Sequence, residues 1–330
     1  MYDVITVGSA TVDVFAKTKV SELIKITDSR GETELLAYPT GSKILIGELE
    51  FTTGGGATNT AVALARLGHK VACISKMGAR GNAEKILRAL KREKIDTSLA
   101  VCSKKGRTGY SIILDSLKHD RTILAFKGSN NELKFSEINK RKLKTKWFYF
   151  STMMEESFKT LEKLSEFAEK NKIKIAFNTS EYLAKKGPKF LKNILSRTTL
   201  FVLNKEEAGL IVGKGNEREL LKKLHNLGPK IVVITDGKHG VHASNGKGIY
   251  FLQPHKVKVV ETTGAGDAFA SSFLSGLIKK NDIKFALKLA SANAESVISH
   301  HGAKNKLLTY KEALADVREN PTKLRKTYKL

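Results

Sequence analysis

The chain has 330 residues, of which 41% are hydrophobic and 28% charged, a composition that fits a folded globular protein and excludes collagen-like, disordered and disulfide-scaffold classes. Lys and Arg number 58 against 33 Asp and Glu, a formal net charge of +25. Because the lysines are scattered over the polar faces of predicted helices, the pattern favours a solvated basic surface over a binding site for nucleic acid.

Strands and helices alternate along most of the chain. The predicted strands cover residues 3–8, 70–75, 147–151, 174–178, 199–204 and 231–235. The predicted helices cover residues 57–68, 81–93, 155–170, 187–196, 216–227, 266–279 and 283–299. This alternation predicts an α/β fold with a mostly parallel central sheet and helices on both faces.

Two segments, 11–53 and 100–127, break the alternation. The second contains the strand-like runs TGYSIIL and RTILAF, with a predicted turn around Lys118 to Asp120. We expect both segments to form a small antiparallel β flap, or lid. No shift in composition marks a second domain, so residues 1–330 are expected to form one domain that carries this lid.

The cysteines and the apolar runs indicate the compartment. Cys73 and Cys102 are far apart and have no CxxC or Cys/His spacing, which suggests neither a zinc site nor a disulfide framework. The first strand lacks the basic flank of a signal peptide, and no apolar run approaches the ~18 residues that span a bilayer. We therefore expect a cytoplasmic protein that does not enter membranes.

The segment VVETTGAGDAFASSFLSGLI, residues 259–278, is the most informative. Gly264 and Gly266 permit a tight turn into a helix, whose first amide N–H groups bind anions. Asp267 lies in the first turn of that helix. A carboxylate beside such amides suits phosphoryl transfer to an alcohol, although an ordinary acidic residue at a helix start is the alternative.

A second segment, residues 51–78, contains a glycine-rich turn just before the first long helix. Gly54 to Gly56 would let the backbone approach a small polar ligand, and Asn59 offers a donor and an acceptor. A strand-to-helix turn capped by Thr58 or Asn59 is the alternative. The chain has no P-loop, no protein-kinase motifs and no dinucleotide-binding glycine motif after its first strand.

With these motifs the chain resembles the ribokinase-like, or PfkB-type, carbohydrate kinases. Residues 261–267 are similar to the family signature D-T-x-G-A-G-D, which implies Asp267 as catalytic base and Gly264, Ala265 and Gly266 as an anion hole. Glu261 replaces the Asp of the signature. In potassium-activated members this position helps hold a monovalent cation, so Glu261 and Thr263 are candidate ligands for K⁺.

The resemblance also implies an acceptor site. Gly55, Gly56 and Asn59 match positions that contact acceptor hydroxyls, and Asp13 matches an acidic residue that holds two of them. An aspartate on a surface turn is the alternative for Asp13. Asn178 follows a strand where the family usually has D-x-N, so its role does not transfer.

The nucleotide end of the family is matched as well. Asn204 to Glu207 fits N-x-x-E, which implies phosphate contacts for Asn204 and a water-bound Mg²⁺ for Glu207; a helix capping box is the alternative. The loop from Thr235 through Gly237 to Gly240 resembles T-x-G-x-x-G. Asn293 resembles an asparagine near adenine, with an internally bonded helix asparagine as the alternative.

The resemblance implies a ribokinase-like fold and transfer of the γ-phosphate of ATP, with Mg²⁺, to a hydroxyl of a small sugar. A nucleoside kinase is the alternative. The resemblance also implies that two copies of the chain could pair through the lid as a homodimer. A scaffold that binds nucleotide or nucleic acid without catalysis remains open. Basic lid residues could hold a phosphorylated sugar, or could be ordinary surface charges: Lys17, Lys19, Lys104, Lys105, Arg107 and Arg121.

Overall fold

The computed structural model describes the chain except residues 19–21, 29–30, 80, 116–120, 301 and 329–330. Its body is built on a nine-stranded sheet. In spatial order the strands are β17 (Lys323–Tyr328), β16 (Ile249–Gln253), β15 (Val241–Ser244), β14 (Ile231–Thr235), β13 (Leu200–Asn204), β12 (Lys174–Asn178), β11 (Thr145–Phe150), β1 (Tyr2–Val7) and β6 (Val71–Ile74). The pairs from β6 to β14 are parallel and the pairs from β14 to β17 are antiparallel. The prediction of a mostly parallel sheet is therefore confirmed.

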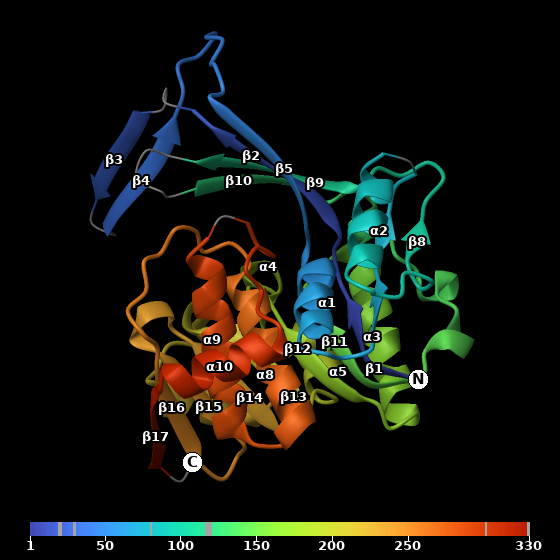
Figure 1. Cartoon of the computed structure of the whole chain (residues 1–330), viewed down its shortest axis with the longest axis vertical. Coiled ribbons are helices and arrows are strands. Elements are labelled where there is room, and N and C mark those ends of the chain that lie inside the picture. Colours follow the sequence, from blue (N-terminus) through green and yellow to red (C-terminus); the bar gives the residue numbers. More distant parts are fainter. Residues whose placement is uncertain (19–21, 29–30, 80, 116–120, 301, 329–330) are drawn as a thin grey trace.

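Helices cover both faces of this sheet (Figure 1). One face packs against α1 (Gly56–Arg66), α2 (Asn82–Arg92), α8 (Ala265–Lys280) and α9 (Ile283–Ile298). The other face packs against α3 (Glu155–Lys170), α5 (Gly187–Leu195), α6 (Lys205–Val212) and α7 (Glu217–His225), with the short α4 (Glu181–Ala184) beside them. α10 (Tyr310–Glu319) packs on α9.

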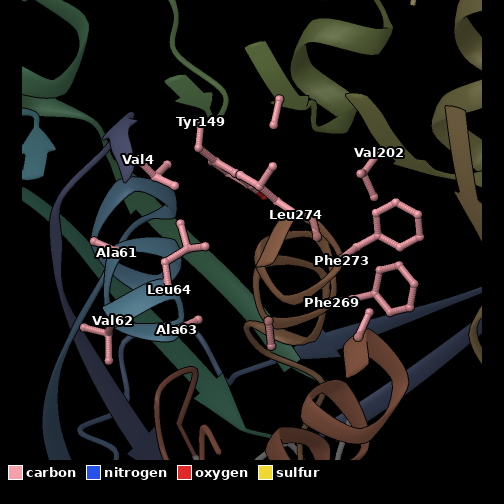
Figure 2. Close-up of a cluster of buried hydrophobic side chains, with 14 of the residues drawn as sticks. Val4, Ala61, Val62, Ala63, Leu64, Tyr149, Val202, Phe269, Phe273 and Leu274 are labelled. Carbon is pink, nitrogen blue, oxygen red and sulfur yellow. The ribbon is translucent and has the colours of Figure 1, made fainter. Parts of the chain in front are cut away.

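Alternation along the strands separates the two cores. Val4 and Tyr149 point to the α1 and α8 side, whereas their neighbours Ile5 and Phe148 belong to the opposite cluster. Figure 2 shows Tyr149 between α1 and α8, with Phe269 and Phe273 of α8 on the far side of that helix. Because strands buried on both faces need apolar side chains at every position, they appear in the sequence as continuous apolar runs.

The lid is a separate four-stranded sheet that extends beyond the body (Figure 1). Its strands, in spatial order, are β10 (Arg121–Phe126), β9 (Gly109–Asp115), β2 (Thr11–Lys17) and β5 (Glu48–Gly54). The small sheet confirms the predicted flap, except that β2 and β9 run parallel, since both strands come from separate segments that leave the body in the same direction. The turn predicted at Lys118 to Asp120 lies outside the described residues.

The root of the lid joins its two segments. The side chain of Asn130, in the 3-10 turn η1 (Gly128–Asn131) after β10, accepts a hydrogen bond from the Ala10 amide and donates one to the Ala10 carbonyl, at 2.9 and 3.0 Å. Ala10 directly precedes β2. A hairpin of β3 (Glu22–Asp28) and β4 (Gly31–Ala37) extends from the far end of the lid (Figure 1).

The predicted helices and strands of the body agree with the structure to within two residues at each end. Most elements absent from the prediction are short: β3, β4, β15 to β17, α4, α6, α10, the pair β7 (Lys76–Met77) and β8 (Val101–Cys102), and the 3-10 turns η1, η2 (Phe135–Glu137), η3 (Lys140–Lys142) and η4 (Gly237–His239). No helix in the described part of the chain has the length and apolar character needed to span a bilayer.

Candidate active site

The turn before α8 places Asp267 at the carboxyl ends of the parallel strands. Gly264 caps the helix with φ 79°, and a Cβ on it would lie 2.7 Å from the Ala303 Cα. Both the positive φ and this close approach require glycine. Asp267 therefore lies in the first turn of α8, next to the amide groups at the helix start, of which that of Ala265 donates to the Thr262 carbonyl at 3.2 Å.

The Asp267 carboxylate is held by Asn59, which lies 208 residues earlier. Asn59 Nδ2 donates to Asp267 Oδ2 at 2.9 Å. Burial raises the pKa of Asp267 to about 6, although the bond from Asn59 and the charge of Lys304 oppose the rise. The carboxyl is thus ionised at neutral pH but is far more basic than a surface aspartate.

The glycine-rich segment forms the turn between β5 and α1. Gly55 has φ 94°, and a Cβ there would lie 2.5 Å from the Ser9 carbonyl oxygen. The Gly56 amide donates to Ser9 Oγ at 3.1 Å, and a Cβ on Gly56 would lie 2.8 Å from Ser151 Oγ. The turn packs directly against the ends of β1 and β11, and no side chain larger than hydrogen fits at these two positions.

Asp13 is buried at the start of the lid. It accepts a hydrogen bond from Thr11 Oγ1 at 2.8 Å, and burial raises its pKa. The charge of Lys304 opposes that rise, as it does for Asp267. Asp13 is therefore not an aspartate on a surface turn.

Lys304 is a residue that the sequence analysis missed. It follows α9, and its Nζ donates to Thr53 Oγ1 at 2.7 Å and to Thr58 Oγ1 at 3.3 Å. Burial lowers the pKa of Lys304 to about 8, despite the nearby charges of Asp13 and Asp267. Nothing in its own segment signals this position, because only tertiary packing brings the loop after α9 to the glycine turn.

A cavity of about 240 Å³, here called the Asp267 cavity, opens between the ends of β1, β11 and β12 and the root of the lid. Its lining includes Asp267, Gly56 and Lys127. Three further lining residues, Ser151, Thr152 and Ser180, have buried hydroxyl oxygens that make no hydrogen bond within the described chain. Ligands bind outside the carboxyl ends of strands in open α/β sheets, so the position itself indicates a binding site.

Asn204 and Glu207 form a capping box at the start of α6. Asn204 Oδ1 accepts from the Glu207 amide at 2.8 Å, and the Glu207 carboxylate accepts from the Asn204 amide at 3.1 Å. Burial, together with the charges of Glu181 and Glu206, raises the pKa of Glu207 to about 7. The capping box given as the alternative is therefore present. The carboxylates of Glu181, Glu206 and Glu207 also lie near one another, and a divalent cation would reduce the repulsion between them.

The end of β14 lies beside Asn204, because Asn204 and Thr235 are direct partners in the parallel ladder. The loop after Thr235 contains Gly237 and Gly240, with φ 47° and 111°. A second cavity of about 580 Å³, here called the Lys205 cavity, lies along this loop. Lys205 bonds Glu217 at 2.7 Å and Asp236 at 3.0 Å across it.

The remaining candidates lie deeper. Asn293 is fully buried, its Nδ2 donates to Ser272 Oγ at 2.7 Å, and its Oδ1 accepts from the Leu308 amide at 2.9 Å. Its side chain is thus used inside the protein, as in the structural alternative. Glu261 accepts a hydrogen bond from the Gly302 amide at 2.8 Å, whereas the buried Thr263 hydroxyl has no hydrogen bond partner in the described chain.

Comparison with protein families identifies the family of this chain. A family model described as pfkB family carbohydrate kinase matches residues 13–309. The chain belongs to this family. It is therefore a phosphotransferase of the carbohydrate-kinase type, and the scaffold without catalysis is no longer favoured.

Curated relatives of this pfkB-family kinase agree. An uncharacterized sugar kinase of Archaeoglobus fulgidus is 28% identical over 74% of this chain and 97% of its own length. A 5-dehydro-2-deoxygluconokinase of Clostridium botulinum is 30% identical over 81% of this chain and 84% of its own length.

Solved structures confirm the ribokinase-like fold. The nucleoside kinase of Methanocaldococcus jannaschii, an archaeal member of the ribokinase family, has a TM-score of 0.79 with 20% identity over 96% of this chain and 99% of that chain. A putative ribokinase II of E. coli in complex with ATP and Mg²⁺ has a TM-score of 0.81 with 16% identity, over 97% of this chain and 100% of that chain.

Proposed function

We propose that this kinase transfers the γ-phosphoryl group of ATP to a hydroxyl of a small sugar, with Asp267 as the general base. The observation that carries the proposal is the contact of Asn59 with Asp267 at the amino terminus of α8, on the wall of the Asp267 cavity. It joins the two glycine-rich segments of the chain in one site.

The chemistry balances on these groups. Asp267 accepts the proton of the acceptor hydroxyl while that oxygen forms a bond to the γ-phosphorus. The bond between this phosphorus and the β–γ bridging oxygen breaks, and ADP leaves. The amides of Gly264, Ala265 and Gly266 stabilise the charge on the transferring group. A base with a pKa of about 6 is ionised at neutral pH and still accepts a proton readily.

The carboxyl ends of β13 and β14 would hold the nucleotide. Thr235, Gly237 and Gly240 offer a hydroxyl and an open glycine loop to phosphates, and Asn204 lies beside them. Mg²⁺, when bound, neutralises charge on the phosphates. Buried Glu207, with Glu181 and Glu206 nearby, fits a water-mediated contact to that ion, and the E. coli structural neighbour was solved with ATP and Mg²⁺.

We propose a monovalent cation site at Glu261 and Thr263. The buried Thr263 hydroxyl supports it, because a cation would satisfy an oxygen that otherwise has no partner in the described chain. The test is turnover with K⁺ replaced by Na⁺ or tetramethylammonium. Equal rates in all three salts would exclude the site.

The lid segments 11–53 and 100–127 would close over the acceptor and exclude water from the reaction. Asp13 lies at the root of this lid and would bind acceptor hydroxyls. We also propose that two copies pair through the lid, since Phe51, Ile112 and Leu124 form one cross-strand row of exposed apolar side chains. Sedimentation of the wild type and of Leu124→Lys tests this pairing.

A nucleoside acceptor remains the second candidate, supported by the likeness to the M. jannaschii nucleoside kinase. A nucleoside base would need an aromatic surface, for which Tyr110 and Phe126 of the lid are candidates. However, they are cross-strand partners whose side chains alternate with that of Ser111, which bonds Asp13. They therefore belong to the lid face opposite Asp13, which weighs against this role.

The experiment is ATP-dependent phosphorylation of ribose, fructose, fructose phosphates, ketodeoxygluconate, adenosine, cytidine and inosine, with ADP and GTP as alternative donors. Asp267→Asn should lower turnover roughly 10²- to 10⁴-fold on the active acceptor. Asp316→Asn on α10 makes the same chemical change outside both cavities and serves as control. Near-normal turnover of Asp267→Asn would refute the base, and activity confined to nucleosides would establish the second candidate.

A further inference from the structure

Lys127 is a cation in the Asp267 cavity that neither the motifs nor the proposed transfer step uses. It lies between β10 and η1, and its Nζ is 4.8 Å from the centre of the Tyr182 ring. No carboxylate in the described part of the chain pairs with it, and burial lowers its pKa. An ammonium in this position lacks the counter-charge that partly buried cations normally have.

Hydroxyl groups surround the same space. Ser151 and Thr152 follow β11, and Ser180 follows β12; all three line the cavity with buried oxygens that have no partner among the described residues. Ser180 occupies the N-cap position of α4, yet its side chain makes no capping bond. Buried hydroxyls are normally hydrogen-bonded, so three of them on one wall indicate a ligand that accepts hydrogen bonds.

An ammonium and three hydroxyl donors together suit an oxyanion better than a neutral polyol. The carboxylates of Asp13 and Asp267 already provide acceptors for sugar hydroxyls. Before ATP binds, a neutral sugar would leave Lys127 without a counter-charge, whereas an anionic group on the sugar would supply it. The Lys127 ammonium therefore indicates that the acceptor carries a negative charge.

The candidate nucleotide residues do not account for this cation, and because the γ-phosphoryl group must reach Asp267 in the same cavity, acceptor binding has to be measured without ATP. The candidate nucleotide residues Asn204 and Thr235 lie at the ends of β13 and β14, along the separate Lys205 cavity. Lys127 instead lies at the root of the lid. Its cavity includes Gly56 of the glycine-rich turn and Ser9, which accepts a hydrogen bond from the Gly56 amide.

We propose that the acceptor is a polyol that bears an oxyanion, either a carboxylate or a phosphate monoester, and that Lys127 is the residue that selects this charge. This inference rests on the proposed kinase function, because it names the class of acceptor at that site. Ser151, Thr152 and Ser180 donate hydrogen bonds to the same anionic group or to the oxygens next to it.

The test measures binding without ATP, by calorimetry, for two matched sets: fructose, 2-ketogluconate and fructose 6-phosphate; and ribose, ribonate and ribose 5-phosphate. We expect at least one anionic member to bind at least tenfold more tightly than its neutral parent, and the member that does so separates carboxylate from phosphate. Lys127→Met should weaken this binding about 10- to 100-fold, and Lys127→Arg should restore most of it.

Lys140→Met is the matched control, because Lys140 also lies over an aromatic ring, that of Phe135 at 4.7 Å, but not in the cavity. It should leave binding unchanged. In turnover assays, Lys127→Met should raise the KM of the anionic acceptor and leave the KM of ATP within twofold of the wild type. Thermal unfolding of each variant checks that the fold is retained.

Two results would overturn the inference. One is binding of the neutral parents as tight as that of both anionic members in each set, or no anionic binding at all. The other is a Lys127→Met variant that changes the KM of ATP and not that of the acceptor. Since binding is measured without ATP, tight anionic binding with no phosphorylated product would refute the kinase function alone, whereas turnover of neutral sugars unaffected by Lys127→Met would refute the inference alone.

Discussion

The two cavities at the carboxyl edge of the sheet differ in how their charges are balanced. In the Lys205 cavity, the ammonium is already bonded to Glu217 and Asp236. In the Asp267 cavity, Lys127 has no carboxylate partner in the described chain, and three hydroxyl oxygens have no hydrogen bond. The ammonium of the first cavity is thus balanced by carboxylates of the chain, whereas that of the second would be balanced by a ligand. Substitutions should therefore have larger effects around Asp267 than around Lys205.

After Asp267→Asn itself, the largest effect is expected from Gly264→Ala. A Cβ would lie 2.7 Å from the Ala303 Cα, at a residue with φ 79°, so the amides before Asp267 must move. We expect turnover to fall roughly 10²- to 10³-fold, comparable to the loss of an oxyanion-hole donor. Steady-state kinetics measure it. Gly209→Ala in α6, where a Cβ meets nothing within 4 Å, is the control; equal turnover of the two variants would refute the prediction.

A smaller effect is expected from Lys304→Met, and it appears as a pH dependence. Because burial raises the pKa of Asp267 to about 6, the wild-type rate should rise with pH as the base loses its proton near pH 6. The charge of Lys304 opposes that rise in pKa, so the variant should need a higher pH. At pH 6 we expect roughly two- to tenfold less activity than the wild type. Lys304→Arg should restore the profile, and an unchanged acid limb in Lys304→Met would contradict the account.

On the nucleotide side, Glu207→Gln should act through the metal and leave the fold intact, because Gln can also complete a capping box. We expect the half-saturating Mg²⁺ concentration to rise about tenfold, a typical effect of altering an outer-shell partner. A magnesium titration of the rate measures it. Glu206→Gln changes the neighbouring exposed carboxylate and should shift the titration less; the reverse order would remove Glu207 from the metal site.

The smallest effect is expected from Lys205→Met. Its two ion pairs are partly exposed to solvent, and ion pairs near the surface contribute about 1 kcal/mol or less to the free energy of unfolding. We expect the KM for ATP to stay within about fivefold of the wild type, because a change of about 1 kcal/mol corresponds to roughly that factor. Denaturant titration and kinetics test both. A loss as large as that of Gly264→Ala would break the contrast between the two cavities.

The body of the fold could be predicted because its signals are local. Apolar runs such as IVVIT in β14, and helical periodicity such as that of α3, are fixed by burial on one or two faces. The antiparallel strands β15 to β17 and the pair of β3 and β4 could not be predicted. β15 and β16 are only four and five residues long, β3 and β4 are largely exposed, and β17 pairs with a strand about 70 residues earlier.

The candidate site shows the same division. The turns at Gly55 and Gly264 could be selected as candidate site segments from the sequence, because their backbone conformation restricts these positions to glycine. Lys304 and Lys127 could not be, since each is one lysine among many basic residues and acquires its position only through tertiary contacts. Asn293 shows that a motif can also suggest too much. Its position matches the family, but the sequence does not reveal that both ends of its amide are bonded inside the protein.

The two hydrogen bonds between Asn130 and Ala10 have a mechanical consequence. They fasten together two of the connections between the lid and the body, the one before β2 and the one after β10, while the ladders from β10 to β5 tie the sheet across its width. We therefore expect the lid to rotate as a rigid body about this root. A pair of spectroscopic labels, one on Glu34 of β4 and one on Lys288 of α9, should report one distance change on adding acceptor, and Asn130→Ala should broaden that distance distribution.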